Sequence, residues 1–345
     1  MNSLRLKYLA LLICGSLVVA CSRTVVKDSD LSWPSPPQPP RVVYERSIYG
    51  SQNLPRSFLS KIKDFLFGRS PDMSMAKPYG ITYDGRSRLY VADTAHKGIL
   101  VFNLNAGGVK FFNSIGSRGN LAEPVNVVLD NHDNIYVADT KLGKIAVFNR
   151  EFDFVKFIGD EQTLESPVGM AVDNSARILF VVDTKLHMVK VFDLEGNFLY
   201  DFGGRGDEKG EFYYPLGIAI NGRDTVYVID SFHFAVQAFD YGGNFLFSFG
   251  HAKAGVGRLA RPRDIAIDSD NNLYITDALN NNVQVFSSRG EFMMEFGALG
   301  YEHGQFRLPA GIFIADNDIY VSDSINKRIQ KFRYLADSDA RRSSR

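Results

Sequence analysis

Oxygen-bearing side chains are concentrated in two short segments that could bind a cation. Residues 130–134 read Asp-Asn-His-Asp-Asn, and residues 268–272 read Asp-Ser-Asp-Asn-Asn. Carboxylate and amide oxygens are the ligands that Ca²⁺ prefers. Both segments lack the central glycine and the terminal bidentate glutamate of an EF-hand loop, so a hairpin turn is the first interpretation and a calcium site the second.

The sequence contains no recognisable motif for covalent catalysis or for phosphate binding. The sequence has no G-x-S-x-G element, and no nucleophile has a histidine partner at a motif spacing. The glycine-rich run at residues 203–206 follows an apolar strand and leads to a proline, which is unlike a strand-to-helix phosphate cradle. We therefore predict no cofactor, with calcium or zinc as the alternatives.

The chain consists of six repeats, each marked by two residues in phase. A proline precedes an apolar strand in each unit, and an aspartate ends the next strand 14 to 16 residues later. The prolines are Pro78, Pro124, Pro167, Pro215, Pro262 and Pro309, and the aspartates are Asp93, Asp139, Asp183, Asp230, Asp277 and Asp323. A period of 43 to 48 residues is typical of a four-stranded propeller blade.

Each unit contains four short apolar runs separated by turn residues. In the fifth unit they are 264–268, 272–276, 282–286 and 291–296. The runs are rich in Val, Ile, Phe and Tyr, and asparagine and glycine between them suit tight hairpins. The sequence therefore predicts an all-β fold, a six-bladed β-propeller of four-stranded antiparallel blades over residues 41–335.

The last unit stops after its third strand, near Phe332, which would leave an unpaired sheet edge. Residues 41–50, RVVYERSIYG, parallel the fourth-strand segment 109–116, VKFFNSIG. We expect this N-terminal strand to complete the last blade and close the ring. Apolar residues at helical spacing predict a short helix at about 55–67 that packs on the propeller or, alternatively, binds a partner. Residues 336–345 are expected to be a disordered tail.

These repeats resemble the NHL family, whose unit reads approximately P-x-G-I-A-V-D, N-I-Y-V-A-D-x-x-N-x-R-I-Q-V-F-D and G-x-F-L-x-x-F-G. Residues 261–296 and 308–332 match this pattern closely, and the resemblance extends over residues 77–334. The second unit departs from the pattern at Leu142 and Gly143. The resemblance implies the same six-bladed propeller.

The first 20 residues read as a lipoprotein signal peptide. Arg5 and Lys7 precede an apolar stretch that is short for a membrane span, and Val18-Val19-Ala20-Cys21 resembles a lipobox. Cys21 would become the lipidated N-terminus, and residues 21–40, rich in proline, would form an extended tether. The residue after Cys21 is Ser22 and not the aspartate that commonly retains such lipoproteins at the inner membrane. We therefore expect the protein in the cell envelope, attached to the outer membrane.

The composition argues against two classes of protein. Removal of residues 1–20 would leave 37 basic and 39 acidic side chains, a net charge of −2 that favours no nucleic-acid partner. Cys14 lies within the predicted signal peptide, so the mature chain would keep Cys21 alone and form no internal disulfide. The hydrophobic core must therefore hold the fold.

One histidine stands where a group of zinc enzymes has a metal ligand. His187, four residues after Asp183, resembles one ligand of the peptidyl-amidoglycolate lyases, which share this fold and bind zinc with three histidines. The corresponding residues of the other units are Lys97, Gly143, Phe234, Asn281 and Lys327. That resemblance would imply a metal-assisted lyase or lactonase in the central channel, but the required triad is missing.

Departures from the repeat predict a binding surface on one face, which we call the top face. It is formed by the loops between second and third strands and the loops that enter each first strand. Exposed aromatic and arginine side chains are typical of binding sites. The candidate binding residues are Tyr79, Asn126, His187, Phe232, His233, Phe234, Arg263 and Asp264. Packing of Phe232 and Phe234 in the core is the alternative. We expect a non-enzymatic module that binds a protein, peptide or glycan; its oligomeric state is left open.

Overall fold

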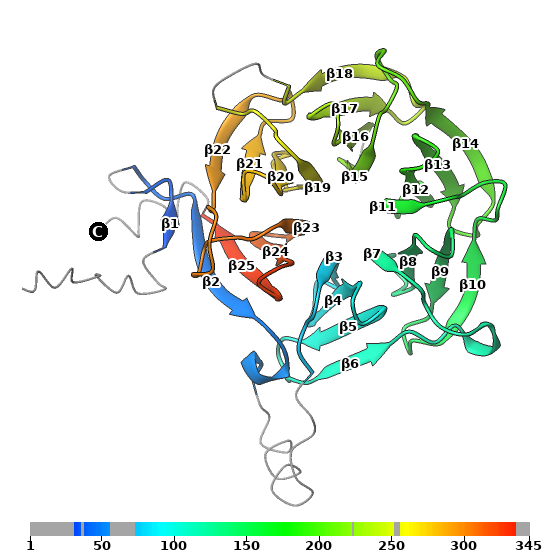
Figure 1. The fold of residues 1–345 in the computed structure, drawn as a ribbon, viewed down its shortest axis with the longest axis horizontal. Coiled ribbons are helices and arrows are strands. Elements are labelled where there is room, and N and C mark those ends of the chain that lie inside the picture. The colour runs from blue at the N-terminus through cyan, green and yellow to red at the C-terminus, as the bar shows by residue number, and fades with distance from the viewer. Residues whose placement is uncertain (1–30, 36–37, 56–72, 223, 252–255, 336–345) are drawn as a thin grey trace, which may run out of the picture.

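Six antiparallel sheets surround a central axis (Figure 1). The strand nearest to the axis in each sheet is the one that begins with the repeated proline, called the first strand of its blade. The computed structural model describes residues 31–35, 38–55, 73–222, 224–251 and 256–335. The expected signal peptide, Cys21, the tail and all but the first residue of the expected helix lie outside these ranges. Within them, no helix is both long and apolar enough to cross a bilayer. The predicted six-bladed propeller is confirmed.

The strands follow the predicted repeat. The first strands are β3 (Pro78–Tyr83), β7 (Pro124–Leu129), β11 (Pro167–Asp173), β15 (Pro215–Ile220), β19 (Pro262–Ile267) and β23 (Pro309–Ala315). The second strands are β4 (Arg88–Asp93), β8 (Ile135–Asp139), β12 (Ile178–Asp183), β16 (Thr225–Asp230), β20 (Leu273–Asp277) and β24 (Asp318–Asp323). The third strands are β5 (Gly98–Asn103), β9 (Lys144–Phe148), β13 (Met188–Asp193), β17 (Ala235–Asp240), β21 (Asn282–Phe286) and β25 (Arg328–Tyr334).

The outer strands complete the blades, and two short 3₁₀ helices lie in the connections. The outer strands are β6 (Val109–Phe112), β10 (Phe154–Ile158), β14 (Phe198–Gly203), β18 (Phe245–Phe249), β22 (Phe292–Phe296) and β2 (Val42–Ile48). The 3₁₀ helices are η2 (Ser51–Asn53) and η3 (Gly116–Arg118).

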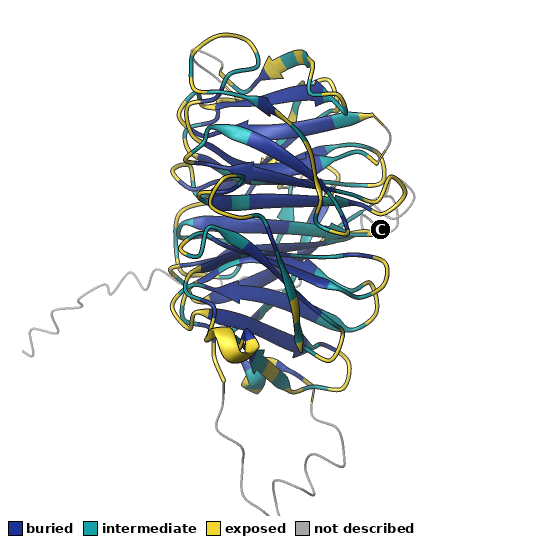
Figure 2. Cartoon of the chain, turned by 90° about the vertical axis from the view of Figure 1, so that its right-hand side faces the viewer, coloured by how far each residue is buried: buried dark blue, intermediate teal, exposed yellow. Residues whose placement is uncertain are grey.

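The core lies between neighbouring blades. Strand centres are buried, whereas the loops at both faces of the ring are exposed (Figure 2). An aromatic residue at the end of an outer strand contacts the next blade, as Phe249 contacts Phe286 with ring centroids 5.1 Å apart and Phe296 contacts Phe332 at 5.0 Å. Each such buried ring contributes about 2 kcal/mol to the free energy of folding.

The six repeated aspartates tie the loops of the top face together. All six are fully buried. Asp93 accepts hydrogen bonds from the backbone of Ala76 and Lys77 before the first strand, and from Ala95 and His96 in the turn after the second. Since a buried carboxylate needs such donors, these aspartates position the loops around the channel and are not free for catalysis.

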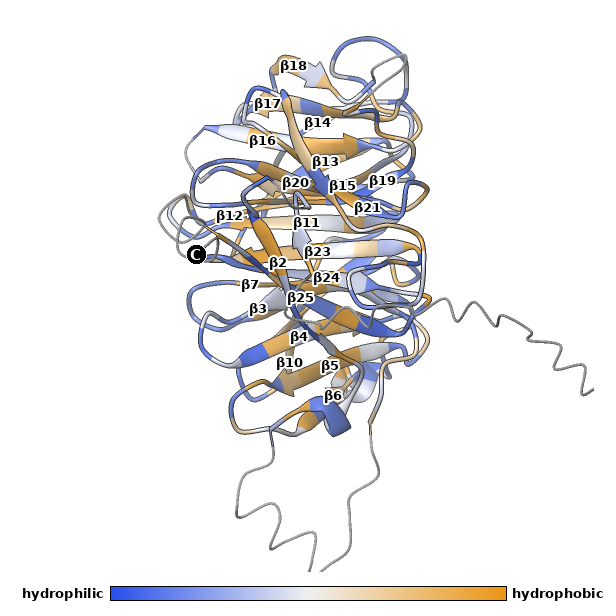
Figure 3. Cartoon of the chain, turned by 90° about the vertical axis from the view of Figure 1, so that its left-hand side faces the viewer, coloured by the Kyte–Doolittle hydropathy of each residue, from blue (hydrophilic) through white to orange (hydrophobic). Residues whose placement is uncertain are grey.

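The N-terminal strand closes the ring as predicted. Strand β2 pairs with β25, which lies beside it in the view of Figure 3, through Val42 opposite Tyr334 to Ile48 opposite Ile329. The structure differs from the expected tether at residues 31–33, because β1 (Ser32–Trp33) adds a fifth strand beside β2. Trp33 packs on Phe296 and Phe332. This aromatic contact holds the segment against the propeller, although its neighbouring prolines favour an extended chain that does not pack.

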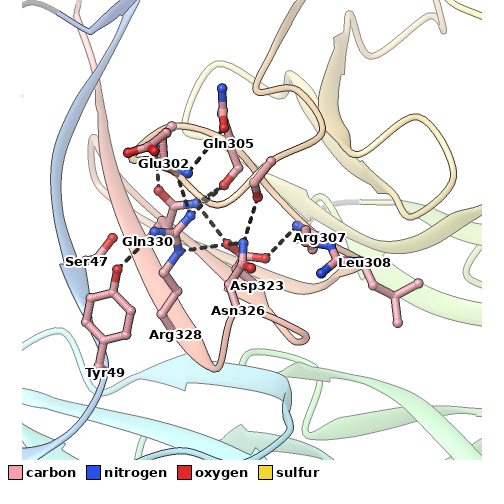
Figure 4. Close-up of polar contacts among 12 residues, drawn as sticks. Ser47, Tyr49, Glu302, Gln305, Arg307, Leu308, Asp323, Asn326, Arg328 and Gln330 are labelled. Carbon is pink, nitrogen blue, oxygen red and sulfur yellow. Dashed lines mark hydrogen bonds and ion pairs between the residues drawn. The ribbon is translucent and has the colours of Figure 1, made fainter. Parts of the chain in front are cut away.

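Arg328 anchors the closing strand inside the last blade (Figure 4). Its side chain is 1% exposed, and Nε donates to Oδ2 of Asp323 at 2.8 Å. Nη1 donates to the hydroxyl of Tyr49 at 3.0 Å, and Nη2 donates to the carbonyls of Glu302 and Gln305. The charge is thus paired and its donors are used, as a buried guanidinium requires.

Candidate functional site

Close contact between neighbouring first strands divides the channel. The third residue of these strands is glycine in four units: Gly80, Gly169, Gly217 and Gly311. A Cβ atom on Gly169 would lie 2.2 Å from the carbonyl oxygen of Leu216, and one on Gly217 would lie 2.7 Å from the Cα of Asp264. Glycine is therefore required at these four positions, whereas the second and fifth units have Asn126 and Asp264 there. Two cavities lie on either side of this level and share no lining residue.

The top cavity, about 480 Å³, opens on the top face. Its wall is formed by second residues of first strands, by the loops that precede them and by the loops that follow the second strands. The lining residues are Lys77, Tyr79, Thr94, Glu123, Val125, Thr140, Ser166, Val168, Thr184, Lys185, His187, Tyr214, Leu216 and Arg263. Lys77, Lys185 and Arg263 carry positive charge and Glu123 is a carboxylate. Lys185 also forms an ion pair with Glu165 at 3.2 Å, so the remaining excess of positive charge is small and favours anions.

Arg263 places a buried hydrogen-bond donor without a partner among the described residues in the wall of this cavity. Its Nη1 donates to the hydroxyl of Tyr79 at 3.0 Å, and Cζ lies 6.0 Å from the centre of the Tyr79 ring. Nε is buried and has no hydrogen-bond partner among the described residues. An unpaired buried donor costs about 1–3 kcal/mol, so the site is built at an energetic cost that a ligand could offset. Burial raises the pKa of Tyr79, and the charge of Arg263 partly offsets the effect.

His187 supplies a second unpaired atom to the same cavity. Its backbone has φ of +57°, a value matched by Lys97, Gly143 and the other residues at this position of the repeat. The turn therefore imposes the left-handed conformation on any residue that stands there. His187 Nδ1 is buried without a partner in the described part of the chain, and the ring lies 6.2 Å from that of Tyr213.

Four exposed aromatic residues extend from the top cavity over the fourth blade. We call Tyr213, Tyr214, Phe232 and Phe234 the aromatic ledge; they are 41%, 39%, 49% and 48% exposed. Phe232 stacks on Tyr214, which also lines the cavity, with centroids 4.8 Å apart. Core packing of Phe232 and Phe234, the alternative weighed from the sequence, is wrong. The tandem tyrosines before Pro215 were not predicted, although no other unit has aromatic residues there.

His233 stands beside the ledge but is held by carboxylates. Its Nδ1 lies 2.7 Å from Asp230 Oδ2 and its Nε2 lies 3.0 Å from Asp207 Oδ1. Partial burial opposes the charged form, yet the two carboxylates together raise the pKa of His233. This histidine therefore orders the turn that carries Phe232.

Asn126 and Asp264 stand at the constriction, in place of the glycines of the other units, and line the cavity on its other side, which corrects their expected place on the top face. Both line the bottom cavity, of about 440 Å³, which opens between the hairpins of the first and second strands. The carboxylate of Asp264 accepts hydrogen bonds from the backbone of Ile265 and Ile312. Burial raises the pKa of Asp264 to about 7 despite these bonds.

The two segments considered for calcium are hairpin turns. Asp130 accepts hydrogen bonds from the backbone of His132 and Asn134 and from the hydroxyl of Tyr136. Asp268 repeats this pattern with Asp270, Asn272 and Tyr274. In the described ranges, no three His, Cys, Asp or Glu side chains are grouped so that they could hold a metal ion.

Comparisons with known proteins agree with this architecture. The NHL repeat family matches residues 259–286. A comparison with curated proteins finds no match. A streptogramin B lyase structure has a TM-score of 0.57 and 14% identity, over 76% of this chain and 94% of that one.

Two further solved structures give similar values. Virginiamycin B lyase from Staphylococcus aureus has a TM-score of 0.56 and 13% identity, over 75% of this chain and 96% of that one. An auxiliary nutrient binding protein from Bacteroides thetaiotaomicron has a TM-score of 0.61 and 15% identity, over 76% of this chain and 70% of that one. At these identities the similarity shows the propeller fold and nothing about activity.

Proposed function

We propose that this NHL-repeat propeller is a binding module of the cell envelope that takes its ligand in the top cavity and along the aromatic ledge. The observation that carries the proposal is the pair of buried, unpaired atoms, Arg263 Nε and His187 Nδ1, in one open cavity. Buried polar atoms in folded proteins are almost always hydrogen-bonded. Among the described residues five such atoms have no partner, and the two nitrogens of this group both belong to the top cavity, which favours a missing ligand. A nutrient-binding relative in fold is consistent with this role.

Membrane attachment forms the second part of the proposal. A lipid on Cys21 would hold the propeller at the outer membrane through the ten residues before Leu31, the first described residue. Metabolic labelling with an alkyne fatty acid should label the chain and fractionate it with membranes, whereas Cys21→Ser should lose the label and leave the membrane fraction. Labelling that persists in Cys21→Ser would contradict lipidation at this residue.

A metal-assisted lyase or lactonase acting in the channel is the second candidate, favoured by the likeness in fold to streptogramin B lyase. It makes a different prediction, since a lyase would convert the ligand to products. Incubation of each bound compound with the full-length chain, with and without Zn²⁺, Mg²⁺ or Ca²⁺, separates the two functions. Unchanged ligand supports the binding module, and metal-dependent turnover supports the enzyme.

The binding proposal is tested by a screen of peptides, oligosaccharides and small metabolites against the full-length chain by ligand-observed NMR. Compounds that bind should lose about tenfold in affinity in the triple variant Phe232→Ala, His233→Ala, Arg263→Leu. Leu246→Ala with Met293→Ala, two exposed residues of the outer strands, is the matched control. Ligands that bind the triple variant and the wild type equally would overturn the proposal.

A further inference from the structure

We infer that the top cavity recognises the terminal carboxylate of its ligand, which is seated against Arg263. The inference rests on the proposed function and specifies the ligand class for the same site. A peptide C-terminus and a sugar acid both offer this group, and the experiment below distinguishes them.

The free side of Arg263 is suited to a carboxylate. Tyr79 occupies Nη1, so Nε is left as the unpaired buried donor. A guanidinium presents Nε–H and a neighbouring Nη–H in parallel, and this fork matches the two oxygens of a carboxylate. Tyr79 thus holds the guanidinium in place through Nη1, and no described group engages Nε, which is covered in the structure, so a carboxylate would reach it after a small shift of the side chains around it. No carboxylate of the described residues forms an ion pair with Arg263.

A comparison with Arg328 shows what a completed arginine site looks like in this chain. Arg328 uses Nε, Nη1 and Nη2 on Asp323, Tyr49 and two carbonyls. Tyrosine occupies Nη1 in both sites, and an aspartate occupies Nε in only one of them. The ligand carboxylate would therefore take at Arg263 the place that Asp323 takes at Arg328.

The depth of Arg263 indicates a terminal group. The cavity lining reaches Tyr79, Leu216 and Arg263, each one residue above the glycine level at which neighbouring strands touch. A chain cannot continue past that level in the same cavity, because the residues beyond it line the other one. Recognition at this depth is therefore end-on, with the remainder of the ligand leaving toward the top face.

The side chains above Arg263 indicate the kind of ligand residue that bears the carboxylate. Val168 and Leu216 offer apolar contact, and Tyr214 connects the cavity to the aromatic ledge. His187 Nδ1 can donate or accept one hydrogen bond, depending on the tautomer of the ring, with a polar atom near the carboxylate. A C-terminal residue with an apolar or aromatic side chain meets these requirements, with its backbone amide near His187.

The test compares acids with their neutral analogues. N-acetyl-L-phenylalanine and N-acetyl-L-phenylalaninamide differ only in the carboxylate, and D-glucuronate with methyl glucoside forms the sugar pair. Dissociation constants are measured by NMR titration of the full-length chain. We expect the peptide acid to bind at least tenfold more tightly than its amide, on the order of a charge-assisted hydrogen-bond pair. Tighter binding by glucuronate than by the peptide acid would identify a sugar acid as the source.

Two arginine variants separate charge from geometry. Arg263→Leu introduces the residue found at the same position of the fourth unit, Leu216, and should remove the preference for the acid. Arg263→Lys keeps the charge without the fork and should retain only part of it. Equal binding of acid and amide, or no binding of either acid at 20 mM, would overturn the inference. If neutral compounds from the screen still bind the top face, the proposed function stands; if none binds there, both fail.

Discussion

The two mouths of the channel contrast in how their polar groups are satisfied. At the bottom cavity, Asp84 accepts hydrogen bonds from three backbone amides of its own turn, and Asp130 is similarly saturated by its hairpin. At the top cavity, Arg263 and His187 each bury an atom that bonds to nothing described. Polar and charged side chains that are fully hydrogen-bonded, as at the bottom cavity, have a structural role. Those with unpaired buried atoms, as at the top cavity, indicate a ligand site.

The largest expected effect that does not depend on pH comes from the glycine level that separates the mouths. Gly169→Ala places a Cβ 2.2 Å from a backbone oxygen of the neighbouring strand, so the free energy of unfolding should fall by about 3 kcal/mol. Urea unfolding measures it. Gly242→Ala, whose nearest contact would be a side-chain atom at 3.3 Å, is the control and should change stability by under ~1 kcal/mol. A loss below that control value would mean that the strands are not in close contact.

Asp264→Asn tests burial of this carboxyl on the bottom side of the channel, and its effect depends on pH. The folded-state pKa is raised to about 7, so the wild type retains a proton that the unfolded chain releases near pH 4. Wild-type stability relative to the variant should therefore fall as pH rises from 4 to 7, by on the order of 4 kcal/mol, and remain constant above 7. Thermal unfolding of both proteins across this range measures the difference. A difference independent of pH would contradict the burial of this carboxyl.

Asp130→Asn should separate stability from binding. The side chain of Asp130 accepts hydrogen bonds from Asn134 and Tyr136, and the amide would lose part of this capacity, for a cost of about 1 kcal/mol. Binding of N-acetyl-L-phenylalanine should be unchanged, since this residue lines the bottom cavity. If the affinity falls by more than the loss of stability can explain, the ligand binds in the bottom cavity.

Phe232→Ser should have the smallest effect on folding. The ring is half exposed on the aromatic ledge, so the free energy of unfolding should change by under ~0.5 kcal/mol. Affinity for the aromatic acid should fall about threefold, because the stack with Tyr214 is lost. Chemical denaturation and NMR titration give the two values. A large loss of stability with unchanged affinity would assign Phe232 to the core.

The fold could be predicted from the sequence because its signals are local and repeated. The proline and aspartate markers set the strands, and the missing fourth strand of the last unit required the one at residues 41–50. The short strand at Ser32–Trp33 was missed, since its proline-rich neighbours argue for an extended segment and its stability comes from distant aromatic rings.

The candidate site was predictable only in part. Tyr79, His187 and Arg263 depart from the repeat and do meet in one cavity, but Asn126 and Asp264 face the opposite one. The second residues of first strands line the top cavity and the residues from the third position onward line the bottom one, so one step along the strand decides the mouth, and sequence alone does not show where that division lies. Unpaired hydrogen-bonding atoms depend on all neighbours at once and leave no sequence pattern.

The central claim is that ligand binds at the top mouth, and methyl NMR tests it most directly. Val125, Val168 and Leu216 line the top cavity, whereas Ile218, Ile265 and Ile312 line the bottom cavity. Titration of the methyl-labelled full-length chain with N-acetyl-L-phenylalanine should shift the first group and leave the second in place. Shifts confined to the isoleucine methyls would contradict the account and place the ligand in the bottom cavity.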